Sequence, residues 1–187
     1  MTVPPFSGVV LTGGRSRRMG TDKAFVVVDG RPMVLRVAAA LQGAGAAEVL
    51  AVGGDGPALA ALGLDARADP RQGEGPLGGI LSAFEVVAHD VVVVLATDLA
   101  WIDAATVARL VHALGERAVA VARTGRREPL CAAWRASASG DELTRAYDGG
   151  ERAVHRAMDR LDAAAVAEVA VTPGLVANAN TPADLGR

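Results

Sequence analysis

The sequence predicts an α/β fold, a single doubly wound domain in which a mostly parallel sheet carries helices on both faces. Two observations support this prediction. Short valine-rich apolar runs alternate along the chain with longer segments whose apolar residues recur at helical spacing. The run at residues 91–96 is apolar throughout, which is typical of a central parallel strand buried on both faces.

The first strand is expected at residues 8–11, where a β-branched apolar run stops at a threonine and two glycines. Helical spacing begins after Pro32, and a second strand follows at 48–52, which completes a βαβ unit. The same patterns then predict a helix around 77–88, a strand at 91–96, a helix around 107–114, strands at 118–122 and 131–134, helices around 143–147 and 154–161, and a strand at 166–171.

The composition favours a small-molecule partner. The chain has 187 residues, of which 51% are hydrophobic, enough for one sizeable core. Lys and Arg number 19 against 21 Asp and Glu, and this balance argues against a general nucleic-acid or membrane surface. A single cysteine, Cys131, and the lack of a signal peptide or long apolar run predict a cytoplasmic protein.

The most informative segment follows the first strand. Residues 11–23, LTGGRSRRMGTDK, hold three glycines and four basic residues against one acidic residue. Glycines let backbone N–H groups approach an anion, so this segment is typical of a polyphosphate-binding loop, the alternative being a solvated surface loop. It has neither GxxxxGK(S/T) nor GxGxxG spacing, which excludes an ordinary P-loop ATPase and a dinucleotide-dependent dehydrogenase.

Lysine and asparagine are rare in this chain. Lys23 is the only lysine, and a compact ammonium is not interchangeable with a guanidinium where a localised charge is needed. Asn178 and Asn180 are the only asparagines, and they alternate along an extended segment, so their side chains point to one face. We interpret all three as retained for function, the alternatives being chance for Lys23 and local backbone bonding for the asparagines.

Two aspartates are further candidates. Asp98 follows the strand at 91–96, so its carboxylate is expected at the carboxyl edge of the sheet, level with the glycine loop. Mg²⁺ takes one or two carboxylates and completes its shell with phosphate oxygens and water, so Asp98 is the predicted metal ligand. The alternative role, capping the next helix, suits Asp103 better. Asp69, before a GPLGG turn at 75–79, is an ordinary turn aspartate on the residues alone.

The order of residues in 11–23 resembles the signature loop of the molybdenum cofactor guanylyltransferases, within the superfamily of sugar-phosphate and cofactor nucleotidyltransferases. Only Thr12 departs, where that family usually has alanine. The resemblance continues at Asp69 and at the short motifs 75–79, 97–98, 128–130, 150–152 and 178–182. It implies a Rossmann-like nucleotidyltransferase domain over residues 1–187, with a nucleotide-binding half at about 6–110 and an acceptor-binding half at about 111–187.

The resemblance also implies an activity: transfer of GMP from GTP to the terminal phosphate of molybdopterin or molybdenum cofactor, with release of pyrophosphate and Mg²⁺ as cofactor. Arg18, Lys23 and Asp98 would be catalytic, Asp98 would bind the metal, and Asn178 and Asn180 would contact the acceptor. The implied nucleotide-binding residues are Leu11, Thr12, Gly13, Gly14, Arg18, Lys23, Asp69 and Asp98. Transient contacts with proteins that supply or receive the cofactor are expected.

Three alternatives stay open. Cytidylyltransferases for the same cofactor resemble this chain but usually have alanine at position 13, so Gly13 favours guanine. Another phosphorylated acceptor is the second alternative. A non-catalytic nucleotide-binding module is the third, and such a module would keep the glycine loop without needing Asp98.

Overall fold

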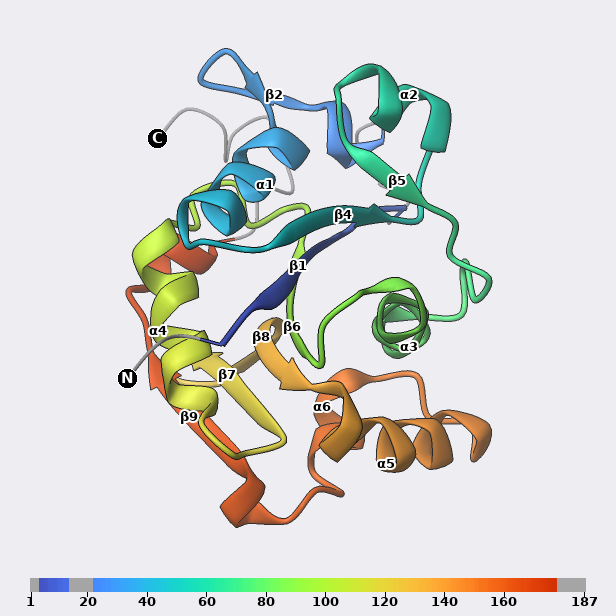
Figure 1. Cartoon of the computed structure of the whole chain (residues 1–187), viewed down its shortest axis with the longest axis vertical. Helices are drawn as coiled ribbons and strands as arrows, with labels where there is room; N and C mark the ends of the chain where they lie inside the picture. The colour runs from blue at the N-terminus through green and yellow to red at the C-terminus, as the bar shows by residue number, and fades with distance from the viewer. Residues whose placement is uncertain (1–3, 14–21, 178–187) are drawn as a thin grey trace.

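The computed structural model describes residues 4–13 and 22–177, which form a seven-stranded sheet in the order β5-β4-β1-β6-β8-β7-β9 (Figure 1). Neighbouring strands are parallel except for β8, which runs antiparallel to both β6 and β7. The predicted mostly parallel sheet is therefore confirmed. Its strands are β1 (Phe6–Leu11), β4 (Glu48–Val52), β5 (Asp65–Arg67), β6 (Val91–Ala96), β7 (Val119–Arg123), β8 (Arg127–Arg135) and β9 (Val166–Ala170).

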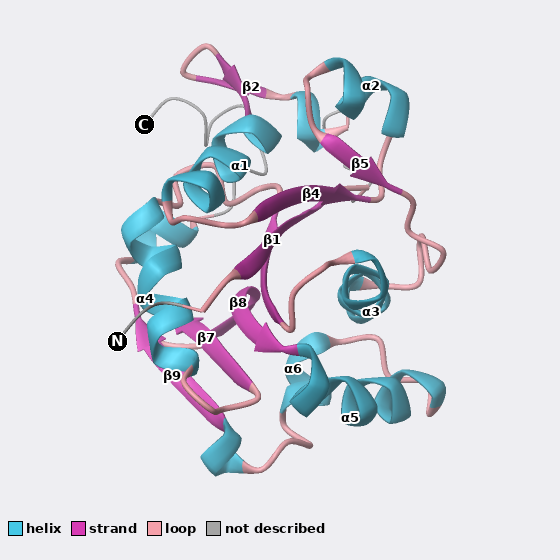
Figure 2. Cartoon of the chain, viewed as in Figure 1, coloured by secondary structure: helices cyan, strands magenta, loops and turns pink. Residues whose placement is uncertain are grey.

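Helices cover both faces of this sheet, as Figure 2 shows. One face carries α1 (Met33–Gly43), the short α2 (Gly56–Ala61) and α4 (Ala104–Leu114). The other carries α3 (Pro76–Val86), α5 (Ala136–Asp148) and α6 (Val154–Met158). A small separate hairpin, β2 (Val27–Val28) with β3 (Arg31–Pro32), precedes α1.

The core divides between the two faces because successive residues of a strand point to opposite sides. On β1, Val10 packs in the cluster that includes Leu41 of α1, whereas Val9 packs in the cluster that includes Ile80 of α3. All of these side chains are buried. Two apolar faces explain why the central strands are apolar without interruption.

The carboxyl ends of β4, β1 and β6 lie level with one another. Leu11, the last residue of β1, is in register with Val52 of β4 and with Ala96 of β6. The backbone N–H and the hydroxyl of Thr97 both donate to the Leu11 carbonyl oxygen, at 3.2 and 2.6 Å. The segments that follow these three strands therefore start side by side.

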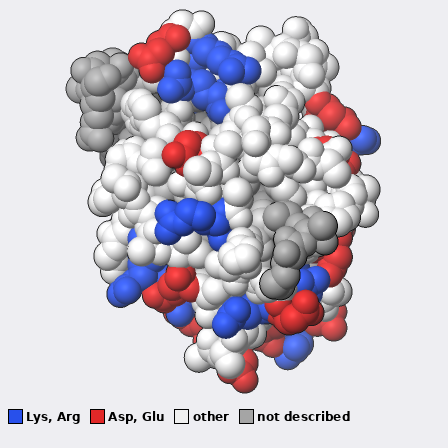
Figure 3. Space-filling view, turned by 60° about the vertical axis from the view of Figure 1, so that its left-hand side comes forward, with Lys and Arg blue, Asp and Glu red and all other residues white. Residues whose placement is uncertain are grey.

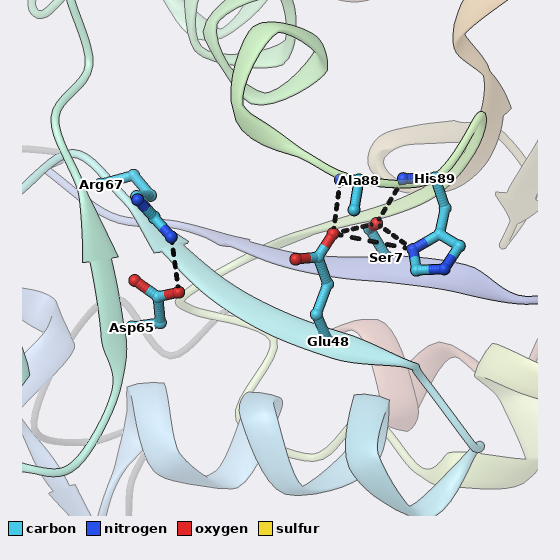
Figure 4. A network of polar contacts seen from close by, with 6 residues as sticks. All are labelled: Ser7, Glu48, Asp65, Arg67, Ala88 and His89. Carbon is cyan, nitrogen blue, oxygen red and sulfur yellow. Dashed lines mark hydrogen bonds and ion pairs between the residues drawn. The ribbon is translucent and has the colours of Figure 1, made fainter.

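A polar network fixes the opposite, amino-terminal edge (Figure 4). The buried hydroxyl of Ser7 on β1 donates to the carboxylate of Glu48 on β4 and lies 3.1 Å from the imidazole Nδ1 of His89. Glu48 also accepts a 2.6 Å hydrogen bond from the Ala88 amide. These bonds tie the starts of two strands to the segment before β6. The central strands are therefore held together at both their amino and their carboxyl ends.

The surface carries charges of both signs. On the face turned forward in Figure 3, acidic and basic side chains lie interspersed on a largely uncharged surface. Across residues 4–13 and 22–177, no helix has the length and apolar character required to cross a membrane.

Candidate active site

Lys23 and Asp98 meet at the carboxyl edge of the sheet. The ammonium nitrogen of Lys23 lies 3.0 Å from Oδ2 of Asp98, and the two side chains are 20% and 18% exposed. Lys23 begins a single 3-10 turn, while Asp98 lies two residues beyond the end of β6. The structure thus brings together the basic residue and the carboxylate that the sequence places at this edge.

The turn that carries Lys23 is fixed by its own neighbours. The Asp22 carboxylate accepts a 3.0 Å hydrogen bond from the Ala24 amide, which caps the turn. Ala24 is buried, and the Met33 amide at the start of α1 donates to the Val26 carbonyl oxygen at 2.9 Å. Asp22 therefore orients the backbone of the turn, and the turn that carries Lys23 is anchored against the start of α1.

Asp98 does not cap α4. That position belongs to Asp103, whose carboxylate accepts a 2.8 Å hydrogen bond from the Thr106 amide, as expected from the sequence. Hydrogen bonds from the side chain and backbone of Thr106 lower the pKa of Asp103 below its usual value. Since α4 has its own cap, the Asp98 carboxylate is left facing Lys23.

Two glycine-containing turns interlock beside this pair. The Thr12 hydroxyl donates to the Val52 carbonyl oxygen at 3.0 Å. Gly13 has a φ of +95°, and a Cβ there would lie 2.9 Å from the backbone nitrogen of Gly54. A Cβ on Gly54 would in turn lie 2.9 Å from the Thr12 hydroxyl oxygen. A threonine at position 12, where the resembling family usually has alanine, is thus accommodated. Its hydroxyl has an acceptor, and Gly54 leaves room for it.

The first turn of α3 packs closely against the end of β1. A Cβ on Gly79 would lie 3.4 Å from a methyl group of Leu11, and one on Gly78 would lie 3.0 Å from Cβ of Arg71. No side chain among the described residues caps α3. The small residues of the GPLGG motif therefore let a helix N-terminus come close to the candidate site, where it favours negative charge.

Asp69 lies at the same edge, in a turn. Its Oδ1 accepts hydrogen bonds from the Ser82 hydroxyl at 2.7 Å and from the Arg71 amide at 2.9 Å. A Cβ on Gly79 would lie 3.9 Å from its Oδ2. These contacts are those of a turn aspartate, and they also hold the carboxylate next to α3.

The motif at 150–152 contacts the turn before α3. The guanidinium carbon of Arg152 lies 4.1 Å from the centre of the Tyr147 ring, and Glu74 interacts with both the Tyr147 hydroxyl and Arg152. A hydrogen bond from Arg156 is the main cause that lowers the pKa of Glu151 to about 2. Segments from the two halves of the chain thus meet close to α3.

The other predicted site residues, Gly14, Arg18, Asn178 and Asn180, lie outside the described residues. Among those that are described, the sequence did not point to Gly54 or Ser82 as parts of the site, and it pointed to Thr97 only through the resemblance at 97–98. A usable signal existed for Gly54, because a pair of glycines follows the strand at 48–52 just as a pair follows the first strand.

The residues present fit a divalent cation that binds together with a polyphosphate. Within the described ranges, no three His, Cys, Asp or Glu side chains gather into a ready-made metal cluster. Mg²⁺ does not require one, since it binds through one or two carboxylates and takes its remaining ligands from phosphates and water. Asp98, at a strand end beside a lysine, provides such a carboxylate.

Known proteins resemble this chain in sequence and in fold. The family described as the MobA-like NTP transferase domain matches residues 8–163. The molybdenum cofactor guanylyltransferase of Xanthomonas euvesicatoria is 39% identical over 117 residues, which cover 62% of this chain and 59% of that protein. The enzyme of the same name from Rhodobacter capsulatus is 34% identical over 97% of this chain and 93% of that protein.

A solved structure gives the same result. The molybdopterin-guanine dinucleotide biosynthesis protein A of Archaeoglobus fulgidus superposes with a TM-score of 0.76 at 25% identity, over 96% of this chain and 94% of that one. The matched residues include the ends of β1 and β6, where Lys23 and Asp98 meet. The chain is therefore a nucleotidyltransferase of the MobA-like NTP transferase family.

Proposed function

We propose that this enzyme transfers GMP from GTP to the terminal phosphate of molybdopterin, free or loaded with molybdenum, and releases pyrophosphate. The names of the two relatives support the substrates. The observation that carries the proposal is the contact between Lys23 and Asp98 beside the glycine turns. Binding of a nucleoside triphosphate requires a positive charge for the phosphates and a carboxylate that can hold a metal ion, both at the same edge of the sheet.

The reaction needs no catalytic base. A phosphate monoester is already largely ionised at neutral pH, so its oxygen can attack the α-phosphorus directly. The new bond joins that oxygen to the α-phosphorus, and the bond from the α-phosphorus to the bridging oxygen breaks to release pyrophosphate. Catalysis then comes from positioning the two phosphates and neutralising their charge.

Lys23 and Arg18 would hold the triphosphate and stabilise the departing pyrophosphate. The position of Lys23 supports its part in this role, because its ammonium lies at the strand edge next to Asp98. Asp98 would hold Mg²⁺, and nucleotidyltransferases of this family generally use a divalent metal ion. When bound, Mg²⁺ would neutralise phosphate charge and make the α-phosphorus more electrophilic.

The nucleoside would be seated by the backbone of residues 11–14 and by Asp69. A carboxylate can accept hydrogen bonds from guanine N–H groups or from ribose hydroxyls. The bonds from Ser82 and Arg71 hold Asp69 in a fixed orientation, which supports this role. Asn178 and Asn180 would contact the acceptor, since an amide can both donate to phosphate and accept from a pterin ring.

We also propose a division of labour along the chain. Residues of about 6–110 would bind the nucleotide and residues of about 111–187 the acceptor, within one continuous sheet. The contact between Arg152 and Glu74, in the turn before α3, supports this proposal because it joins the two halves close to the candidate site. The acceptor and the product would be exchanged with proteins that supply or receive the cofactor.

A thermal-shift titration in the presence of Mg²⁺ tests the nucleotide. We expect GTP to raise the melting temperature and CTP to leave it nearly unchanged. The reverse result would support the second candidate, cytidylyl transfer, which Gly13 disfavours because alanine is usual there in the cytidylyltransferases. GTP binding without pyrophosphate release by the wild-type protein would instead favour the non-catalytic module.

A further inference from the structure

Arg36 of α1 bridges the segment after Asp98 and the segment after Lys23. Its Nε donates a 2.8 Å hydrogen bond to the Ala100 carbonyl oxygen, and one terminal nitrogen donates to the Val28 carbonyl oxygen at 3.3 Å. The same nitrogen lies 3.2 Å from a carboxylate oxygen of Asp29, and the Arg36 side chain is 24% exposed. One guanidinium therefore joins three points on two separate segments.

These two segments form a small cluster of their own. Val28, Met33 and Ala100 are buried together, and Val26 and Trp101 pack against them. Beyond Asp98, this loop otherwise makes short local turns, such as the hydrogen bond from the Ile102 amide to the Leu99 carbonyl oxygen. The Arg36 contacts thus complement an apolar cluster that is small compared with the two main cores.

We propose that Arg36 is a positioning residue of the active site. It fixes the loop that carries Asp98 relative to the turn that carries Lys23, so that the carboxylate and the ammonium face one triphosphate. The inference rests on the proposed function, because the roles of Lys23 and Asp98 come from it. A lysine cannot replace this guanidinium, since a single ammonium lacks the planar fork that reaches acceptors in different directions.

The expected kinetic signature follows from this geometry. In the proposed function, other segments would bind the base and sugar of the nucleotide, namely the glycine turn at the end of β1 and the turn at Asp69, and both turns are held by their own hydrogen bonds. Loss of Arg36 should therefore leave the KM for GTP nearly unchanged. A displacement of reacting groups by about 1 Å lowers turnover by on the order of 100-fold, so kcat should carry the effect.

Arg135 provides a matched control. Its guanidinium also contacts a backbone carbonyl, that of Gly115 at 2.5 Å, and a carboxylate, that of Asp90 at 3.2 Å. Its side chain is 22% exposed, close to the value for Arg36. Arg135 is in register with Val91, the first residue of β6, so it lies at the amino edge of the sheet, away from the site.

The test compares Arg36→Lys with Arg135→Lys. We expect Arg36→Lys to lower kcat by about 10- to 100-fold while the KM for GTP stays within about twofold. Arg135→Lys should keep both constants within about twofold of wild type, even if the two variants lose similar thermal stability. A kcat for Arg36→Lys that equals that of Arg135→Lys would overturn the inference.

A second readout needs no substrate. Trp101 lies in the loop after Asp98, so its quenching by acrylamide, measured in a Trp134→Phe background, reports on that loop. Quenching should increase in Arg36→Lys and stay unchanged in Arg135→Lys. If the wild-type protein released no pyrophosphate with any triphosphate, the proposed function would fail, yet unchanged quenching in Arg36→Lys would still refute the positioning role.

A milder variant covers the case in which Arg36→Lys does not fold. Asp29 is largely exposed, and Asp29→Asn removes the negative charge beside the guanidinium without changing the buried cluster. We expect Asp29→Asn to show the same effect to a smaller extent, a lower kcat with an unchanged KM for GTP. An unchanged kcat together with unchanged Trp101 quenching would contradict the inference.

Discussion

The ammonium of Lys23 lies 3.0 Å from the carboxylate of Asp98, although the two residues are 75 positions apart in the chain. The contact follows from the strand order, because β1 has β4 on one side and β6 on the other. The chain leaves β1 toward β4 and β5 and later returns to β6, so the order reverses between β1 and β6. Open α/β sheets bind ligands at such a switch point, beyond the carboxyl ends of the strands.

Replacing Asp98 by alanine should abolish turnover while GTP binding survives in part. We expect the rate of pyrophosphate release to fall by on the order of 100-fold or more, because the carboxylate would act mainly in the transition state. Isothermal titration with GTP measures the binding that remains. Asp98→Asn, which keeps the size of the side chain, serves as the matched variant, and unaltered turnover in either protein would remove Asp98 from the mechanism.

Lys23→Arg should lose activity although it conserves charge. The larger planar guanidinium cannot occupy the place of an ammonium 3.0 Å from Asp98 without moving one of the two groups. We expect kcat to fall by about 10-fold or more, and Lys23→Gln to be slower still. Equal kcat values for the wild-type protein and Lys23→Arg would show that the single lysine of the chain is a chance result of its composition.

Gly13→Ala should destabilise the protein more than Gly63→Ala. Both glycines have a positive φ, +95° and +80°, but only the Gly13 position has a close neighbour, the backbone nitrogen of Gly54 at 2.9 Å. The left-handed backbone alone costs about 1 kcal/mol for alanine, and the clash at position 13 adds to this cost. Urea unfolding measures the difference, and equal losses for the two variants would argue against the interlocked turns.

Asp103→Ala should lower the free energy of unfolding by about 1 kcal/mol, whereas Asp103→Asn, which keeps the acceptor, should cost less. The pKa of Asp103 is lowered, chiefly by its hydrogen bonds with Thr106. Its charge-dependent contribution is therefore present above the ordinary pKa and is lost as the pH falls through the lower pKa of the folded state. Urea titrations at pH 7 and in mild acid measure this, and a difference that grew on acidification would contradict it.

Cys131 should be unreactive in the folded protein. Burial, with a smaller contribution from Glu128, raises the pKa of its thiol to about 12. Since the thiolate is the nucleophile, a disulfide reagent at pH 8 should label Cys131 only as fast as the protein unfolds. The chain has one cysteine, so the labelling is unambiguous, and rapid labelling without denaturant would contradict the described packing.

The long buried elements could be predicted from the sequence. Strands expected at 48–52 and 91–96 are found there as β4 and β6, because each is apolar enough to be recognised alone. The six-residue α2 and the two-residue strands β2 and β3 are too short to show a period. The antiparallel direction of β8 could not be predicted either, because the apolar pattern of a strand does not encode its direction in the sheet.

The site could be predicted only in part, for a related reason. Asp98 was identifiable because a polar residue after a buried strand must emerge at the sheet edge. Arg36 and Thr97 act through backbone carbonyls of segments far away in the chain, which a local pattern does not reveal. Their roles depend on which loops pack together, and that is decided by the whole fold.

The central claim, guanylyl transfer at the switch point between β1 and β6, is tested most directly by pyrophosphate release. The protein is incubated with molybdopterin, Mg²⁺ and each of the four nucleoside triphosphates in turn, beside Asp98→Ala. We predict pyrophosphate and a GMP-linked pterin with GTP, and neither product with the variant. Absence of pyrophosphate with every triphosphate, or equal release by Asp98→Ala, would contradict the account.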